Sequence, residues 1–288
     1  MNVHVGLDIG GTKLLVAAAA GGQIIRRVQC PTPLDLDAGL ALLRAMIDEV
    51  AGADQIAAFG AAAGGPLDWQ HGVISPLHQP QWRAVPLAAI IEAAYGCPLF
   101  VDVDTNVAAL GEYRFGGATA SRMLYLTLST GMGGGFVVNG QIYRGAHGAH
   151  PEVGHQAIPY HCAHPERIRC ACGNVDCLEA LISGNAIRRI YQKPAEALDA
   201  AEWHEVAYNL GQGLRNLATI YLPDLIVLGG GVAVGGGAAL LDAARTVMAE
   251  RLHLVPVPPI ALSQLGYDTA LYGAIALAME GFTGARDL

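Results

Sequence analysis

The sequence predicts an α/β protein with two similar lobes, and three observations support this prediction. Short apolar strand patterns alternate with helical patterns along the chain. Gly accounts for 37 of the 288 residues and is clustered in turns at strand ends. The strand–turn–strand order of residues 3–28 returns at residues 123–143, where Gly140-Gln141-Ile142-Tyr143 echoes Gly22-Gln23-Ile24-Ile25. This echo predicts a duplicated unit of mixed β-sheet and helices.

The elements of the first half follow from short aliphatic runs, which indicate strands, and from longer amphipathic stretches, which indicate helices. Strands are expected at residues 3–7, 14–20, 24–28 and 99–103, and helices at residues 35–50, 87–95 and 104–112. Asp104 or Thr105 is available as the N-cap of the last of these helices.

In the second half, strands are expected at residues 123–128, 136–138, 141–143 and 225–228, and helices at residues 195–222, 238–251 and 270–279. Asn139-Gly140 is the dipeptide typical of a two-residue hairpin turn. We therefore expect lobes at residues 1–110 and 111–273, the second carrying a cysteine-rich segment at 150–180. The C-terminal helix 274–288 is a candidate addition to the first lobe, and a ligand is expected in a cleft between the lobes.

Composition excludes several classes of function. Hydrophobic residues make up 52% of the chain and charged residues 15%, which suits a large core and not a disordered chain. With 17 basic against 25 acidic residues, a net charge of −8 and two lysines, nucleic-acid binding is not expected. The sequence shows no signal-peptide pattern and no uncharged apolar run of about 18–20 residues. A cytoplasmic protein without a membrane partner is therefore expected.

Three glycine-rich turns at strand ends together predict a nucleotide site, although each alone is also explained as an ordinary turn. Glycines let the backbone approach a phosphate and offer N–H donors, and Asp8 can hold Mg²⁺ beside the first turn. Neither a P-loop nor a Rossmann fingerprint is present. The residues concerned are Gly10, Gly11, Thr12 and Lys13, then Thr130 and Gly131, then Gly229, Gly230 and Gly231.

A cluster of thiols predicts a zinc site. Cys170, Cys172 and Cys177 lie within eight residues, and with His155 upstream they supply the four ligands of a closed Cys₃His site. In a reducing compartment such spacing favours a metal over disulfides. His161, Cys162 and His164 lie in the same segment, so the identity of the ligands stays open.

Two carboxylates are candidates for catalysis and sugar binding. Asp104 follows a predicted strand and can serve either as a helix cap or as the base that phosphoryl transfer to an alcohol requires. Glu152 and His155 are three residues apart, so on a helical turn they share a face and can hold neighbouring hydroxyls of a sugar. A metal bound to one nitrogen of His155 would fix the orientation of its ring.

These motifs resemble those of the ROK (repressor, open reading frame, kinase) sugar kinases of the actin/hexokinase superfamily, over essentially the whole chain. The resemblance is carried by Asp8-Ile9-Gly10-Gly11-Thr12-Lys13, Asp104-x-Asn106-x-Ala108-Ala109-Leu110-Gly111-Glu112, Ser129-Thr130-Gly131-x-Gly133-Gly134-Gly135, Glu152-x-Gly154-His155, Cys177-Leu178-Glu179, Leu228-Gly229-Gly230-Gly231 and Leu271-Tyr272-Gly273-Ala274.

The resemblance implies a two-lobed actin-like ATPase (ribonuclease H-like) fold and an ATP-dependent hexokinase with Mg²⁺ and a structural Zn²⁺, often a homodimer. It implies Asp104 as the base acting on a hexose hydroxyl, usually that on C6, and Glu152 and His155 as partners of sugar hydroxyls. Gly65 matches a sugar-contacting turn. The glycine-rich turns are implied as phosphate loops, and the zinc ligands implied are His155, Cys170, Cys172 and Cys177.

The sequence departs from the family pattern at three positions. Val103 stands where glucose-type members usually have Asn, Asp176 where Gly usually precedes the last cysteine, and Gly64 where Pro is frequent. The His150-Pro151-Glu152 spelling is similar to that of bacterial fructokinases in the family. Glucose, mannose and fructose therefore stay open as substrates. The alternatives are an N-acetylglucosamine or N-acetylmannosamine kinase and a non-catalytic sugar-binding regulator, although the predicted strand at Val3 leaves no room for the helix-turn-helix of the family's repressors.

Overall fold

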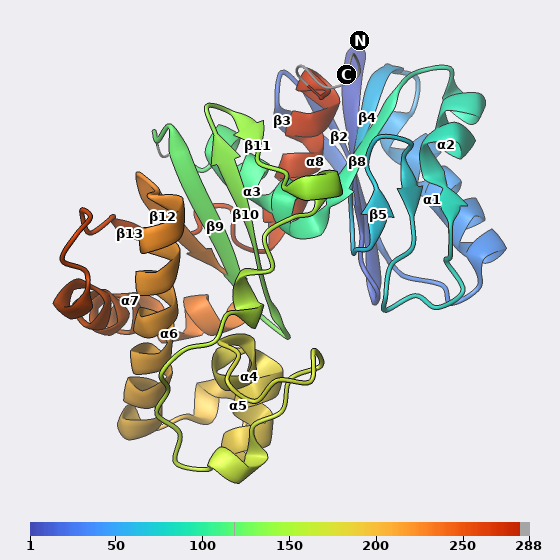
Figure 1. Cartoon of the computed structure of the whole chain (residues 1–288). Helices are drawn as coiled ribbons and strands as arrows, with labels where there is room; N and C mark the ends of the chain where they lie inside the picture. The colour runs from blue at the N-terminus through green and yellow to red at the C-terminus, as the bar shows by residue number, and fades with distance from the viewer. Residues whose placement is uncertain (118, 283–288) are drawn as a thin grey trace. The chain divides into compact units, whose positions relative to one another are not determined.

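The computed structural model describes residues 1–117 and 119–282, and the chain divides into two compact units (Figure 1). The first unit comprises Met1–Ala118, Gly140–His150 and Asp268–Leu288, and the second comprises Thr119–Asn139 and Pro151–Tyr267. Compared with the lobes expected at 1–110 and 111–273, the first unit extends to residue 118 and also takes in Gly140–His150. Residues 283–288 of the expected C-terminal helix lie outside the described residues.

The first unit is built on a mixed five-stranded sheet with the order β3-β2-β1-β4-β8. Its three N-terminal strands form an antiparallel meander, and β4 and β8 continue the sheet parallel to β1. The strands are β1 (Asn2–Ile9), β2 (Lys13–Ala20), β3 (Gln23–Pro31), β4 (Gln55–Ala63) and β8 (Leu99–Val103). A separate small sheet contains β5 (Leu67–Asp68), β6 (Val73–Ile74) and β7 (Val85–Pro86).

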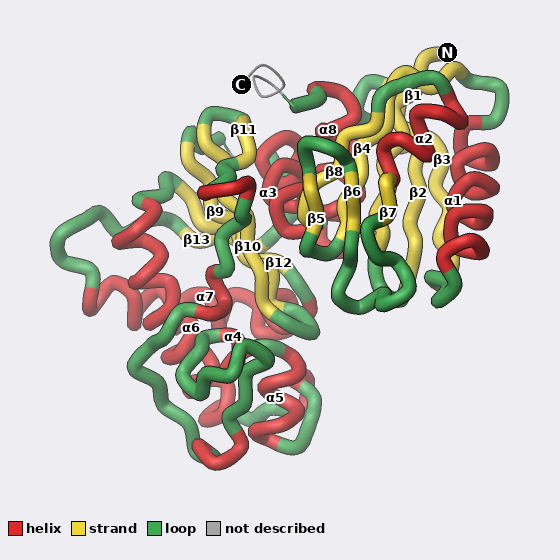
Figure 2. The backbone as a smooth tube through the Cα atoms, turned by 45° about the vertical axis from the view of Figure 1, so that its right-hand side comes forward, coloured by secondary structure: helices red, strands yellow, loops and turns green. Residues whose placement is uncertain are grey.

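Helices cover both faces of this sheet (Figure 2). One face packs against α1 (Leu36–Ala51) and α2 (Leu87–Tyr95), and the other against α3 (Asp104–Phe115) and α8 (Thr269–Glu280). The Asp35 side chain caps α1 by accepting a hydrogen bond from the Ala38 N–H at 2.9 Å. Apolar side chains line both faces of the central strands, which is why these strands read as continuous aliphatic runs.

Glycines allow α8 to lie directly on α3 and β4. A Cβ atom at Gly273 would stand 1.7 Å from the Val107 carbonyl oxygen, and one at Gly60 would stand 1.9 Å from that of Ala274. Gly111 is also closely packed, since a Cβ atom there would stand 2.4 Å from the Thr269 carbonyl oxygen. Only glycine permits backbones to approach this closely. The tight packing fixes α3, and with it Asp104, against the sheet of the first unit.

The second unit contains a sheet in which β10, β9, β12 and β13 are neighbours in this order. Its strands are β9 (Arg122–Leu128), β10 (Met132–Val138), β12 (Leu225–Gly229) and β13 (Ile260–Leu262), and its helices are α4 (Glu179–Ile182), α5 (Gly184–Tyr191), α6 (Ala200–Tyr221) and α7 (Gly231–Arg251). Asn139 and Gly140 both have positive φ, as the predicted hairpin turn requires, and β11 (Gln141–Ile142) follows them.

By length and apolar composition, α7 is the one helix among the described residues that could cross a membrane. It packs instead within the second unit, where Leu240, Leu241, Ala244 and Met248 are buried in the hydrophobic core. This is the ordinary position of a core helix, so α7 does not indicate a membrane protein.

Several predicted elements differ from the structure. The helix expected at 195–222 begins at Ala200, because Asp199 and Glu202 form a capping box there. The helix expected at 238–251 begins seven residues earlier, at Gly231, and is interrupted at Gly237, whose φ is +56°. The strand expected at 136–138 begins at Met132, within the predicted glycine turn. Strand β4 was not expected at all, because its alanines do not stand out as a strand pattern.

Candidate functional site

In the first unit, the turn between β1 and β2 is closed by backbone hydrogen bonds. The Gly10 N–H donates to the Lys13 carbonyl oxygen at 3.0 Å. Thr32, directly after β3, holds the turn, since its hydroxyl donates to the Gly10 carbonyl oxygen at 2.7 Å. A Cβ atom at Gly11 would stand 3.0 Å from the His78 Cβ, so a side chain there would crowd His78. The turn is therefore rigid and presents little side-chain bulk.

Asp104 is the first residue of α3 and directly follows β8. Val103 is the N-cap of this helix and makes no side-chain cap hydrogen bond, so the expectation that Asp104 or Thr105 is the cap is wrong. The Asp104 carboxylate is exposed, accepts a hydrogen bond from the Thr105 N–H at 2.7 Å and lies at the positive end of the helix dipole. The Asp104 side chain is thus accessible to solvent at the start of α3.

Asp8, at the end of β1, has a strongly perturbed acidity. Burial raises the pKa of Asp8 to about 6, with further contributions from the negative charges of Asp104 and Asp268 and an opposing one from Lys13. Carboxylates that disfavour each other's ionised form are stabilised by a divalent cation with oxygen ligands. This electrostatic arrangement suits Mg²⁺ beside the glycine turn.

Replacing Asp8 with Asn should stabilise the metal-free protein only at pH values at which Asp8 is ionised. Because the pKa of Asp8 is about 6 in the fold against 3.8 ordinarily, the stability associated with its protonated form is lost as pH rises through 6. The loss approaches about 3 kcal/mol. Urea unfolding should show Asp8→Asn to be more stable than wild type at pH 8 and equal to it near pH 4. The same difference in stability between Asp8→Asn and wild type at both pH values would contradict the raised pKa of Asp8.

Gly65 lies in the loop that follows β4 and is joined to Pro66 by a cis peptide bond. The Leu77 N–H donates to the Gly65 carbonyl oxygen at 3.1 Å. A Cβ atom at Gly65 would stand in ordinary contact with its neighbours, 3.8 Å from His150 Cε1 and 4.0 Å from Val103 Cγ2. Gly65 therefore lies close to the residue that precedes Asp104.

In the second unit, the predicted phosphate turn at Thr130 and Gly131 is held by α4 and α5. The first two residues of α5 bind the turn, since the Gly184 and Asn185 N–H groups donate to the Ser129 and Thr130 carbonyl oxygens at 2.7 and 3.1 Å. Glu179 accepts a hydrogen bond from the Met132 N–H at 2.9 Å. Glu179 belongs to the Cys177-Leu178-Glu179 motif but has no role that the sequence alone predicts, and its position directly after Cys177-Leu178 connects this turn to the thiol cluster.

Gly229, Gly230 and Gly231 join β12 to α7. Gly230 has a φ of +87°, and a Cβ atom there would stand 2.3 Å from the Leu128 carbonyl oxygen. At Gly229 a Cβ atom would stand 2.4 Å from the Tyr125 hydroxyl oxygen. The three glycines let the chain turn tightly into a helix whose N-terminal N–H groups can face an anion.

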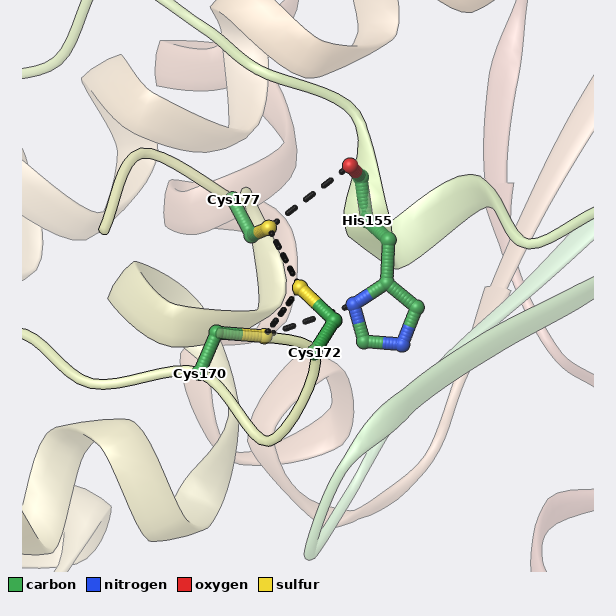
Figure 3. Close-up of side chains that lie close together, drawn as sticks. All are labelled: His155, Cys170, Cys172 and Cys177. Atoms are coloured by element: carbon green, nitrogen blue, oxygen red, sulfur yellow. Dashed lines mark hydrogen bonds between the residues drawn. The ribbon is translucent and has the colours of Figure 1, made fainter. Parts of the chain in front are cut away.

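The structure brings together the four predicted zinc ligands, His155, Cys170, Cys172 and Cys177 (Figure 3). One candidate donor atom from each residue lies within 4.8 Å of the others. The Cys172 sulfur lies 3.3 Å from that of Cys170 and 3.4 Å from that of Cys177, and the Cys170 sulfur lies 3.4 Å from His155 Nδ1. These sulfurs are too far apart for disulfides, whose S–S bond is about 2.05 Å, and their spacing suits a shared tetrahedral ion.

The acidities of the thiols differ in the metal-free cluster. Burial raises the pKa of Cys177 to about 12, whereas the Asn174 N–H is the main cause that lowers the pKa of Cys172 to about 7. A metal ion that binds thiolates would compensate the cost of ionising the buried thiol. Of the alternative ligands, His161 stacks on Tyr208 with ring centroids 3.7 Å apart, and none of His161, Cys162 and His164 belongs to the group of four donors.

Glu152 and His155 lie at the start of the same segment, around the short 3₁₀ helix Val153–His155. The Glu152 carboxylate lies 3.8 Å from His155 Nε2, while His155 Nδ1 faces the thiol cluster (Figure 3). One nitrogen of the ring is thus directed at the metal position and the other at an exposed carboxylate. A metal on Nδ1 would orient Nε2 for a ligand.

The chain is similar to curated sugar kinases along its whole length. The sequence model described as "ROK family" matches residues 4–280. The glucokinase of Streptomyces coelicolor is 30% identical, over 97% of this chain and 98% of its own. The fructokinase of Zymomonas mobilis is also 30% identical, over 95% of each chain.

Solved structures agree with these relatives. The ROK hexokinase from Thermus thermophilus gives a TM-score of 0.84 at 32% identity and covers 96% of this chain and 98% of its own. A ROK family glucokinase from Streptomyces griseus, in complex with glucose and AMPPNP, gives a TM-score of 0.77 at 28% identity, with 97% and 100% covered. The predicted α/β fold of the actin-like ATPases is confirmed.

Proposed function

Because the chain belongs to the ROK family and is a sugar kinase, we propose that it transfers the γ-phosphoryl group of ATP to a hexose hydroxyl, with Asp104 as the general base. The observation that carries this proposal is the exposed Asp104 carboxylate at the start of α3, in the electrostatic environment of Asp8. A carboxylate in this position can accept the proton of the attacking hydroxyl.

The other residues of the first unit position the nucleotide. Asp8 would hold Mg²⁺, which when bound supplies charge compensation for the β- and γ-phosphates. The backbone N–H groups of Gly10 to Lys13 would donate to phosphate oxygens, and Lys13 adds a positive charge. In the second unit, Thr130, Gly131 and the three glycines at the junction of β12 and α7 would bind the rest of the nucleotide.

The sugar would be held by Gly65, Glu152 and His155. We assign the Cys₃His cluster to a structural Zn²⁺, since three thiols and an imidazole nitrogen gather around one point. Ligation through Nδ1 would fix the His155 ring, so that Nε2 and the Glu152 carboxylate could pair with neighbouring sugar hydroxyls. We place the enzyme in the cytoplasm, where thiols stay reduced, and expect it to act as a homodimer.

The identity of the sugar is tested by ADP release from ATP·Mg²⁺ with glucose, mannose, fructose, N-acetylglucosamine and N-acetylmannosamine. We expect a hexose without an N-acetyl group to be the best acceptor, with phosphate on C6. The Val103 side chain offers no hydrogen bond, so fructose is expected to compete well with glucose. Strong preference for an N-acetylhexosamine would correct the substrate. Folded, zinc-loaded protein that phosphorylates none of these sugars would overturn the proposed function.

A further inference from the structure

The segment between the hairpin at Asn139-Gly140 and the sugar-binding pair carries a histidine that the proposed function does not use. A Cβ atom at Gly65 would stand 3.8 Å from His150 Cε1 and 4.0 Å from Val103 Cγ2. His150 and Val103 therefore both lie next to Gly65, within the first unit, at ordinary van der Waals distance from the position of such a Cβ atom. Val103 directly precedes Asp104, so His150 shares its place beside Gly65 with the neighbour of the proposed base.

We propose that His150 binds a hydroxyl of the sugar and is a specificity-determining residue of this kinase. The inference rests on the proposed function. Val103 is apolar and almost fully buried, so a sugar hydroxyl facing it gains no hydrogen bond from its side chain. The His150 imidazole is only partly buried and can donate or accept such a bond.

The loop that bears His150 is fastened tightly to the first unit. Arg144, at its start, forms a double-donor ion pair with the buried Asp102, in which Nε donates to Oδ2 at 2.9 Å. The guanidinium also stacks on Trp69, 4.1 Å from the ring centroid, and lies 5.0 Å from that of Phe282. Asp102 is held in turn by the Asn106 side chain at 3.1 Å. Arg144 is thereby anchored to both β8 and α3.

The rest of the loop folds on itself. The Gly145 N–H donates to the Ala149 carbonyl oxygen at 2.7 Å, and the Gly148 N–H donates to that of Gly145 at 3.1 Å. Gly148 has a φ of +77°, and a Cβ atom there would stand 2.5 Å from Trp69 Nε1. The backbone thus packs against the indole ring, and this packing holds His150 in a defined position. Such preorganisation is what a specificity contact requires.

Asp102 and Arg144 are thus positioning residues, and His150 is the residue that binds the sugar hydroxyl. Asp102 is buried and committed to Arg144, so it is not an alternative to Asp104 as the base. The contact of His150 should contribute to sugar affinity and little to the chemical step, since it acts on a hydroxyl that need not react.

The test is a kinetic and calorimetric comparison of wild type with His150→Ala, His150→Gln and His147→Asn. His147 is the matched control, because it lies exposed in the same loop with a φ of +57°, which Asn tolerates. We expect His150→Ala to raise KM for the preferred hexose about tenfold, with kcat and KM for ATP changed less than about threefold. His150→Gln, which keeps hydrogen-bonding atoms, should recover most of the affinity.

Titration of the sugar alone, without ATP, should show the same tenfold loss of affinity in His150→Ala and no loss in His147→Asn. A hexose affinity in His150→Ala within about twofold of wild type would overturn the inference. Loss of affinity in His147→Asn equal to that in His150→Ala would overturn it too, because the loop alone would then be responsible. These results are distinct from failure of the proposed function, in which wild-type protein would phosphorylate no hexose.

Discussion

Replacing Asp104 with Asn should lower kcat by about a thousandfold and leave the affinity for the sugar within about threefold of wild type. The amide cannot accept the hydroxyl proton, but it preserves the shape of the side chain and can still hydrogen-bond. The substitution should not unfold the protein, because Val103 and not Asp104 is the N-cap of α3. Stopped-time product assays and sugar titration measure the two quantities separately.

The matched control for this variant is Asp37→Asn. Asp37 is also an exposed acidic residue in the first turn of a helix, α1, and has no proposed catalytic role. Both substitutions remove one negative charge near a helix N-terminus, so a general electrostatic effect would appear in both. A kcat for Asp104→Asn within tenfold of wild type would remove Asp104 as the base.

Removing the zinc ion should lower the affinity for the sugar by about tenfold or more and destabilise the segment from His155 to Cys177. The cluster closes this segment, whose ends are otherwise joined by few backbone bonds, such as those from the Ile158 N–H to the Asp176 carbonyl oxygen and from the Leu178 N–H to that of Gln156. Structural zinc contributes on the order of 10 kcal/mol to the folding of small domains. Without it, the ring of His155 is no longer held.

Cys170→Ser and Cys97→Ser make a matched pair for this prediction. Each removes one half-buried thiol, but Cys97 lies outside the cluster. Elemental analysis should find one zinc per chain in wild type and Cys97→Ser, and much less in Cys170→Ser, whose sugar affinity should fall in parallel. Unchanged sugar affinity in folded protein that lacks zinc would show that the metal does not hold the binding pair.

Local signals were enough to place many elements. The helix expected at 87–95 and the strand expected at 99–103 have the same bounds in the structure, where α2 ends at Gly96 in the left-handed conformation. Strand β4 escaped prediction because an alanine-rich run takes its conformation from its neighbours β1 and β8. The start of α7 was not predicted, because the run of Gly235, Gly236 and Gly237 is typical of a turn and unfavourable in a helix.

The sequence was sufficient to predict residues of the candidate site, but not the contacts between them. Motifs placed Asp8, Asp104 and the thiols, because each lies at a strand end or in a dense local pattern. The hydrogen bond of Glu179 with Met132 and the effect of the Asp268 charge on the pKa of Asp8 join residues far apart in the sequence, so no local pattern displays them. His150 is likewise visible only once the loop from Arg144 is folded against Gly65 and Val103.

The most direct test of the central claim is to follow the γ-phosphoryl group of labelled ATP in the presence and absence of hexose. The account predicts that ADP release depends on the hexose and that the label appears in hexose 6-phosphate in equal amount. ADP release that continues without the sugar, with all of the label in inorganic phosphate, would contradict it and indicate a hydrolase.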